Sequence, residues 1–395
     1  MHNLIHIGLK FLVWVPAIGG LAYFLLAILA VQKLKRKHAI ANVSQDYSPS
    51  VSLLKPLYGI DPELGKNLET FFRQDYPVFE ILFAVRDESD PSVALVQKLM
   101  KRFANIPCTL IVTGEPPYPN AKVFSLEKMA KVASHDLLVI TDSDVSVDSN
   151  YLTNIARSFE DKEVGLVTNL YRGVGGQDLW SKLEALGMST EFMAGVIVAE
   201  FLEGMKFSLG PSMAISTTCL RAIGGFGSLA DYLADDFILG EKVFLQEFRV
   251  VLSADVINHH AYSTGFQNSF KHRLRWNRSS RFSRPAGYFG QGFTYGLPWA
   301  LILFLFTPTG WSATLLLGSA ILRGWLAYAM GKQLLGDSSV IRRLWLVPLQ
   351  DVLSFATWVG GFFGTEVVWR GERYRIQRGG RFTRIPDPLA PPEKM

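Results

Sequence analysis

Cysteine is nearly absent from this chain. Its 395 residues include two cysteines, Cys108 and Cys219, which are too few for a disulfide framework or an all-cysteine metal site. A single disulfide is one interpretation, and two reduced thiols in a reducing compartment is the preferred one.

Charge is also scarce. Only 19% of the residues are charged and 49% are hydrophobic, whereas ordinary soluble domains contain about 25% charged residues. This composition excludes a disordered chain and indicates several domains, part of which lie in lipid. The formal net charge of +5 is suited to phosphate-rich ligands or to anionic membranes.

One run of hydrophobic residues lies near the N-terminus. Residues 11–31 are uncharged, and this run reaches the ~20 residues that a helix needs to cross a bilayer. It is longer than the apolar region of a signal peptide, and no cleavage site follows it. The basic cluster at 33–37 places that end in the cytosol. We therefore predict an N-terminal transmembrane anchor over residues 1–37.

A second apolar block follows Pro285. The turn signal at 307–310 divides it into helices over about 288–306 and 311–330, and a third apolar segment over 344–365 contains Asp351. We predict C-terminal membrane helices over 285–365 and a basic tail over 366–395. Three full crossings would place the basic tail outside, against the positive-inside tendency, whereas two crossings with an interfacial or re-entrant third segment would keep it in the cytosol.

Residues 48–284 have the polarity of an ordinary globular domain. Short β-branched runs alternate there with amphipathic stretches, which predicts an α/β fold with a mostly parallel, Rossmann-like sheet. The runs are 51–57, 79–85, 109–113, 137–141, 164–169 and 212–216, and the helical stretches are 64–73, 93–103, 126–133 and 151–159. Ligands of such sheets bind beyond the carboxyl ends of the strands.

Acidic residues stand at those strand ends. Asp142 and Asp144 follow the run 137–141, and two carboxylates in a D-x-D motif can share a divalent cation that also binds a diphosphate. The alternative is a helix cap. Asp87 follows the run 79–85 and is equally typical of a turn. Asp235 and Asp236 precede a helical stretch, where they are either a capping pair or a general base facing a cleft.

A basic cluster precedes the second apolar block. It includes Arg275, Arg278 and Arg281, whose spacing places them near one another on a helix face. Such a face binds phosphates bidentately or lies on anionic lipid. Nucleic-acid binding is disfavoured because no recognition motif accompanies these residues.

These motifs occur in a fixed order along the chain. They are 52–57, Gly59, 61–62, 67–72, 75–77, Asp87 with 90–91, Lys122 with Leu126, 142–144, 165–167, 234–236 and 275–276. The order resembles that of inverting, membrane-bound glycosyltransferases of the GT-A fold, and within them the ceramide glucosyltransferases of family 21. His272 departs from the family, which has Gln or Arg at that position. The segments 170–173 and 272–276 are also similar to bacterial relatives that glycosylate hopanoid lipids.

The resemblance implies roles for individual residues. Asp87, with Asp90, would hold uridine, and Asp142 and Asp144 would hold Mg²⁺ or Mn²⁺. Asp236 would be the general base with Asp235 beside it. Lys122, Arg275 and Trp276 would belong to the donor site. His259 and His260 are either plain turn residues or supply one further metal ligand, and residues 186–205 either line a lipid entrance or pack between domains.

The resemblance also implies the reaction. One hexose, with glucose expected, would pass from a UDP-sugar to the hydroxyl of a ceramide-like lipid with inversion. The alternatives are a hopanoid-lipid N-acetylglucosaminyltransferase and a processive polysaccharide synthase. The protein would be an integral, multi-pass membrane protein with a cytosolic catalytic domain, which in a bacterium would lie in the inner or plasma membrane. Its partners would be the UDP-sugar, the lipid acceptor and the bilayer.

Overall fold

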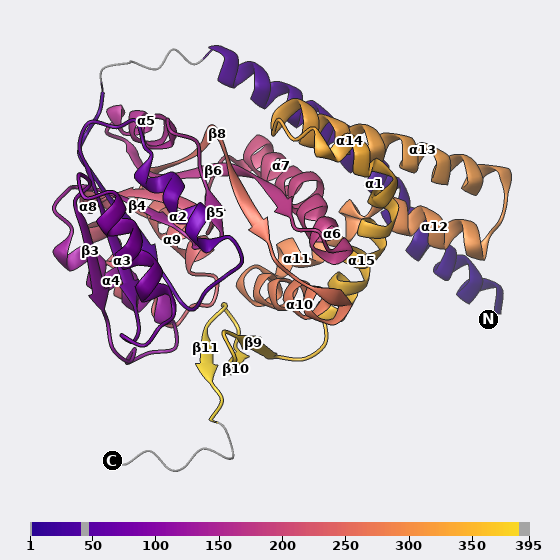
Figure 1. The fold of residues 1–395 in the computed structure, drawn as a ribbon. Coiled ribbons are helices and arrows are strands. Elements are labelled where there is room, and N and C mark those ends of the chain that lie inside the picture. Colours follow the sequence, from indigo (N-terminus) through magenta and orange to yellow (C-terminus); the bar gives the residue numbers. More distant parts are fainter. Residues whose placement is uncertain (1, 41–46, 387–395) are drawn as a thin grey trace.

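The computed structural model describes residues 2–40 and 47–386 (Figure 1). Met1 of the predicted anchor and residues 387–395 of the predicted basic tail lie outside the described residues. The chain folds into a mixed α/β domain beside a group of apolar helices, with a small second sheet below them.

An eight-stranded sheet forms the centre of the α/β domain, in the order β3-β2-β1-β4-β7-β6-β8-β5. The strands are β1 (Val51–Pro56), β2 (Phe79–Val85), β3 (Cys108–Val112), β4 (Leu137–Thr141), β5 (Val145–Ser146), β6 (Val164–Gly175), β7 (Ser212–Ser216) and β8 (Arg249–Ala261). Strands β3, β2, β1 and β4 pair in parallel, whereas β7 and β5 run opposite to their neighbours. The α/β class and the mostly parallel sheet are confirmed.

Helices cover the sheet. They are α2 (Leu64–Phe72), α3 (Ser92–Arg102), α4 (Ala121–Val132), α5 (Tyr151–Arg157), α8 (Thr217–Ala222) and α9 (Asp235–Leu245). Every residue of β1 and β4 is buried, which explains why these strands are continuous apolar runs rather than alternating ones. Because β1, β2 and β4 run parallel, the loops that follow them meet at one edge of the sheet.

The long apolar helices lie side by side at the other end of the molecule (Figure 1). They are α1 (His2–Ile40), α12 (Gly296–Phe306) and α13 (Gly310–Tyr328), with α14 (Ser339–Arg343) and α15 (Val347–Gly361) next to them. Among the described residues, three helical segments are long and apolar enough to cross a membrane: Val13–Lys37, Leu179–Glu203 and Gly310–Leu334. A fourth is possible if the bent pair Pro285–Thr294 and Gly296–Phe306 forms one span.

The segment Leu179–Glu203 joins the two regions. It comprises α6 (Leu179–Gly187), a π-helical turn η2 (Met188–Phe192) and α7 (Met193–Glu203). More than half of it is buried within the molecule, against β6 on one side and α1 on the other. This burial favours the interpretation that it packs between domains.

Asp351 interrupts an apolar helix, and its partner explains why. Arg323 on α13 donates from Nε to Asp351 Oδ2 at 2.9 Å and from Nη2 to Oδ1 at 2.9 Å. Both side chains are almost fully buried. A bidentate pair of this kind is how an acid is accommodated among apolar helices.

The region predicted as a basic tail contains a folded sheet. Its strands are β9 (Glu366–Trp369), β10 (Glu372–Ile376) and β11 (Phe382–Arg384), paired antiparallel. The sheet packs against Leu233 of the α/β domain, and Asp231 O accepts a hydrogen bond from Phe382 N at 2.9 Å. The structure thus places residues 366–384 on the α/β domain.

Candidate active site

The D-x-D motif connects β4 to the short strand β5. Strand β5 pairs with β8, so that Val145 lies opposite His259, and His260 N donates to Asp144 O at 2.8 Å. The sheet therefore brings a segment more than a hundred residues further along the chain against the motif. His259 contacts Asp144 as a result, which sequence spacing alone does not reveal.

Distant side chains hold the main chain of this loop. Lys55 Nζ donates to Asp142 O at 2.6 Å, and Ser143 Oγ donates to Asp61 Oδ2 at 3.1 Å. Lys55 is fully buried and its ammonium lies 4.0 Å from the centroid of the Phe71 ring. Burial lowers the pKa of Lys55 to about 7, although Asp142 and Asp144 oppose that shift. A lysine inside the apolar strand β1 is thus a structural anchor of the acidic loop.

The two carboxylates of the motif contact different bases. Asp142 Oδ1 pairs with Lys122 Nζ at 2.6 Å, and Asp144 Oδ2 lies 3.3 Å from His259 Nε2. Burial alone raises the pKa of Asp144, but His259 and Lys55 outweigh it and hold this pKa at about 2. Asp144 is therefore ionised at any physiological pH.

One oxygen of Asp144 is left without a partner. Its Oδ1 is buried and accepts no hydrogen bond within the described part of the chain, and the same holds for Nδ1 of His259. Buried polar atoms are rarely unpaired in folded proteins. In residues 2–40 and 47–386, no three His, Cys, Asp or Glu side chains converge on one metal position. The bare carboxylate oxygen fits a hard cation that takes its remaining ligands from a phosphate group.

Lys122 connects the D-x-D motif to the second acidic pair. It lies in the first turn of α4, whose N-cap is Asn120, and its Nζ is 3.9 Å from Asp235 Oδ2 as well as 2.6 Å from Asp142. Burial lowers the pKa of Lys122, but the charges of Asp142 and Asp235 together raise it by more than burial lowers it. The net shift is therefore upward. A permanently charged ammonium thus lies between the two acidic pairs.

Asp235 and Asp236 occupy the first turn of α9. Asp236 Oδ2 accepts from Gly210 N at 2.7 Å, and Oδ1 accepts from Phe237 N at 2.8 Å. A Cβ at position 210 would lie 2.9 Å from Asp236 Oδ2, so a larger residue there would displace this carboxylate. Burial raises the pKa of Asp236 despite the opposing charge of Lys122. Burial raises the pKa of Asp235 to about 6, with Asp236 adding to the shift and Lys122 opposing it.

The basic cluster lies on α10 (Gly265–Ser283), which is followed by α11 (Pro285–Gln291). Arg278 Nε donates to Phe363 O at 3.0 Å and Arg281 Nη1 to Gly361 O at 2.8 Å. These two arginines therefore hold the end of α15 and do not face a phosphate site.

Arg275 and Trp276 lie one turn earlier on α10. Trp276 packs against the ring of His272 at 4.4 Å between centroids, and His272 Nδ1 lies 2.6 Å from Glu184 Oε1. Within the described ranges, Arg275 forms no ion pair. Burial lowers its pKa to about 10, and the charge of Arg370 adds to that shift, whereas Glu184 opposes it.

Asp87 and Asp90 take part in local turns. Asp87 Oδ1 accepts from Ser89 N at 2.7 Å and Asp87 is exposed. Asp90 Oδ1 accepts from Ser92 N at 2.9 Å, and its Oδ2 accepts from Gly59 N at 2.9 Å. Neither carboxylate lines the neighbouring pocket.

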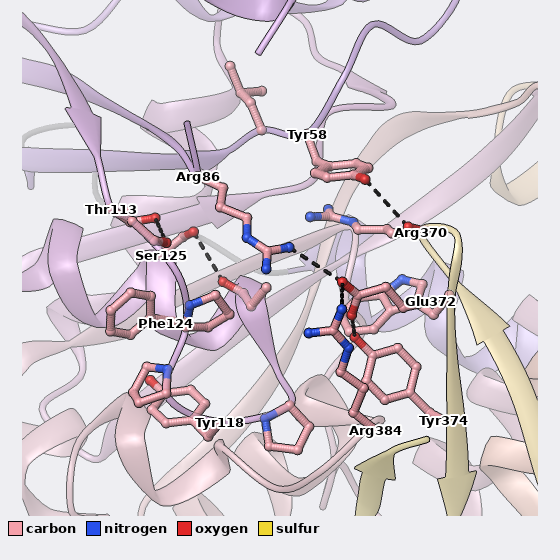
Figure 2. Close-up of a pocket in the computed structure, with 17 residues that line it drawn as sticks. Tyr58, Arg86, Thr113, Tyr118, Phe124, Ser125, Arg370, Glu372, Tyr374 and Arg384 are labelled. Atoms are coloured by element: carbon pink, nitrogen blue, oxygen red, sulfur yellow. Dashed lines mark hydrogen bonds and ion pairs between the residues drawn. The ribbon is translucent and has the colours of Figure 1, made fainter. Parts of the chain in front are cut away.

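A pocket of about 250 Å³ opens beside the ends of β1, β2 and β3. Figure 2 shows aromatic rings and guanidinium groups around it. The loop before α4 supplies Tyr118 and three prolines, and the loop after β1 supplies Tyr58. The opposite wall comes from the C-terminal sheet, including Arg370 and Tyr374. The sequence did not predict that this wall, Lys55 or Asn120 belongs to the site. The one sequence feature that could have indicated it is the position of Lys55, a lysine inside an apolar strand.

Comparison with known proteins now identifies the family. The model of glycosyl transferase family 21 matches residues 12–382. Ceramide glucosyltransferase 1 of Caenorhabditis elegans is 27% identical over 229 residues, which are 58% of this chain and 49% of that protein. Ceramide glucosyltransferase of Candida albicans is 37% identical over 116 residues, 26% of this chain and 21% of that protein. The chain spans about half the length of the first of these relatives.

The fold has a counterpart among solved structures. A mannosyltransferase from Pyrobaculum calidifontis, solved in complex with GDP-Man and Mn²⁺, superposes with a TM-score of 0.52 and 19% identity, covering 89% of this chain and 99% of that one. This similarity confirms the GT-A class of the sheet. The family match over most of the chain shows that it belongs to glycosyl transferase family 21.

Proposed function

We propose that the protein transfers one hexose, with glucose expected, from a UDP-sugar to the hydroxyl of a ceramide-like lipid, with inversion at the anomeric carbon. The names of its relatives support this choice of donor sugar and acceptor. The observation that carries the proposal is the position of Asp236, a partly buried carboxylate of raised pKa that Lys122 and Asp235 connect to the D-x-D motif.

Asp236 is the proposed general base. Each of its oxygens accepts one backbone hydrogen bond, which fixes the carboxylate and leaves a lone pair of each oxygen free. The acceptor hydroxyl donates to one of these oxygens and transfers its proton to Asp236. The hydroxyl oxygen bonds the anomeric carbon as the bond from that carbon to the UDP oxygen breaks, and UDP leaves. Proton removal of this kind contributes about 10²–10⁴-fold to the rate. The raised pKa makes the ionised carboxylate a better base than an exposed aspartate.

The diphosphate of the donor lies beside the D-x-D motif in this proposal. Asp142 and Asp144 would hold Mg²⁺ or Mn²⁺, which offsets the charge that develops on the leaving UDP. Lys122 keeps Asp142 oriented, and Arg275 binds the phosphate oxygens. Trp276 packs beneath the donor or the acceptor.

The nucleoside occupies the adjoining pocket. Aromatic rings and prolines line it, and such surfaces stack on a base. Asp87, with Asp90, would hold the uridine from the loop that follows Arg86, which lines the pocket.

The lipid acceptor reaches Asp236 from the bilayer. The rings of Phe207 and Phe237 stack 6.0 Å apart immediately beside it, and these partly buried apolar groups suit a lipid chain. We propose that α1 and the C-terminal helices span the membrane several times and that the catalytic domain lies in the cytosol. The long N-terminal helix and the apolar block after Pro285 support this arrangement.

Purified full-length protein in lipid nanodiscs tests the proposal. It is incubated with UDP-glucose, ceramide and Mn²⁺, and the lipids are analysed by mass spectrometry and the anomeric configuration by NMR. We expect a single β-linked hexose on ceramide with the wild type and at least a 100-fold loss for Asp236→Asn. A hopanoid acceptor with UDP-N-acetylglucosamine, and a search for polymer, are further arms. Product in either of those arms but none on ceramide would replace the proposal with the corresponding alternative.

A further inference from the structure

The tip of the C-terminal hairpin projects towards the donor side of the site. Arg370 and Gly371 form a two-residue turn between β9 and β10, with φ of 51° and 82°. Two successive residues with positive φ define the tight hairpin turn whose twist matches that of its strands. Arg370 adopts this conformation although it has a side chain, so the turn presents a guanidinium at a defined position.

The hairpin is tied to the α/β domain by a network around Glu372. Its Oε1 lies 3.0 Å from Arg384 Nη2 and 3.5 Å from Nη1 of Arg86, which follows β2. The hydroxyl of Tyr374 donates to its Oε2 at 2.5 Å. Figure 2 shows these groups side by side on the wall of the pocket. The hairpin thus joins residues almost three hundred positions apart in the sequence.

Arg370 itself lies between the pocket and the acidic loop. Its guanidinium is 5.0 Å from the centroid of the Tyr58 ring, and Asp142, Asp61 and Asp144 are close enough for their charges to act on it. Burial lowers the pKa of Arg370, and these carboxylates oppose the shift. Arg370 is also close enough to Arg275 to lower the pKa of that residue.

Both Arg275 and Arg370 lie within electrostatic range of Asp142 and Asp144. In the part of the chain that the structure describes, neither Arg275 nor Arg370 forms an ion pair with a carboxylate. The two positive charges repel each other, and an anion bound between them would offset that repulsion. Guanidinium groups bind phosphate oxygens through paired N–H donors, and a diphosphate provides enough oxygens for both.

We infer that Arg370 is a donor-binding residue, which reaches from the C-terminal hairpin to bind the diphosphate of the nucleotide sugar opposite Arg275. The inference rests on the proposed function, since it assumes a nucleoside diphosphate donor. It assigns a binding role to a segment that lies beyond the last apolar helix and outside the α/β domain.

Binding of UDP and of uridine to the full-length protein with Mn²⁺, measured by calorimetry, tests this role. Arg370→Gln should weaken UDP binding roughly 10- to 100-fold, because a charge-assisted hydrogen-bond pair is lost. Its uridine affinity should fall by much less, about 3-fold at most, because uridine lacks the diphosphate oxygens that the guanidinium would bind. Arg373→Gln is the matched control, because Arg373 lies on the same hairpin, is 58% exposed and pairs with Glu366. This control should bind UDP like the wild type.

The other results of the binding experiment either overturn the inference or contradict the proposed donor. Equal UDP binding by Arg370→Gln and the wild type overturns the inference and leaves the proposed function intact. A parallel loss of UDP and uridine binding also overturns it, because a structural role affects both ligands. If the wild-type protein binds no UDP, that result contradicts the proposed UDP-sugar donor and not only the role of Arg370. If Arg370→Gln does not fold, Arg370→Lys replaces it, and a UDP affinity equal to that of the wild type overturns the inference, since an ammonium cannot bind bidentately.

Discussion

Acidic residues follow both β2 and β4, but the two loops are held in different ways. After β2, the carboxylates of Asp87 and Asp90 accept hydrogen bonds from residues two positions further on. After β4, Asp142 is held by Lys55, 87 residues away, and Asp144 by His259, 115 residues away. The first pair completes its own turn, with one further hydrogen bond from Gly59 N to Asp90. The second pair is oriented by distant bases and retains a bare oxygen, which is the arrangement that a ligand requires.

The largest difference between the loops is expected at the bare oxygen. Asp144→Asn should lower kcat/KM on the order of 100-fold or more, because it removes a charge and a metal ligand at the leaving diphosphate. Initial rates at increasing Mn²⁺ concentration measure this, and EDTA should abolish turnover in the wild type. Asp148→Asn is the control, since Asp148 is exposed just after the motif. Similar rates for both variants would show that the motif is not a metal site.

Removal of an anchor of the β4 loop should have the next largest effect. In Lys55→Met, the carbonyl of Asp142 loses its donor, and such outer partners typically contribute about 10- to 100-fold to activity. Activity is compared with Lys101→Met, which removes an exposed lysine, and thermal unfolding is recorded for both. Unchanged activity of a folded Lys55→Met would mean that the loop keeps its geometry without the anchor.

The two acidic regions should also differ in their response to pH. The general base must be ionised, so kcat/KM should fall about tenfold per unit as the pH drops below the raised pKa of Asp236 and should level off above it. The hydrogen bond from Ser89 lowers the pKa of Asp87, so Asp87 stays ionised across this range. The residual activity of Asp236→Asn should lack the acidic limb. Circular dichroism at each pH excludes unfolding, and an unchanged limb in the variant would assign it to another group.

The smallest effect is expected after β2. Asp87→Asn should raise the KM for the UDP-sugar by at most roughly threefold to tenfold, because one hydrogen bond of an exposed group contributes about 0.5–1.5 kcal/mol. Steady-state kinetics beside Asp144→Asn make the comparison direct. A 100-fold effect at Asp87 would show that the two loops are functionally alike despite their different contacts.

The sequence predicted those elements whose burial is visible in their own residues. Strands β1, β2 and β4 are apolar on both faces, so their bounds could be predicted within one or two residues, and the D-x-D motif falls at a strand end as expected. Contacts over long sequence separations could not be found in this way. Lys55 occurs inside an apolar run, and nothing in that run reveals the carbonyl that it reaches.

The C-terminal sheet illustrates the same limit. Residues 366–384 contain many arginines, which made the region similar to a solvated tail. Its core depends on Leu233 and on four side chains of its own, Val367, Tyr374, Ile376 and Phe382. Their spacing can be recognised as a strand pattern only once the partner surface is known. Likewise, the basic face of α10 was interpreted as a phosphate or lipid contact, whereas Arg278 and Arg281 cap the end of α15.

The hairpin that carries Arg370 has a consequence for the synthesis of the protein. It is translated after the apolar helices of the described residues, so those helices have already been synthesised before one wall of the pocket exists. A nascent chain that stops after α15 holds the D-x-D motif and Asp236, yet its pocket is open on one side. The order of translation therefore keeps the pocket incomplete until these apolar helices have been made.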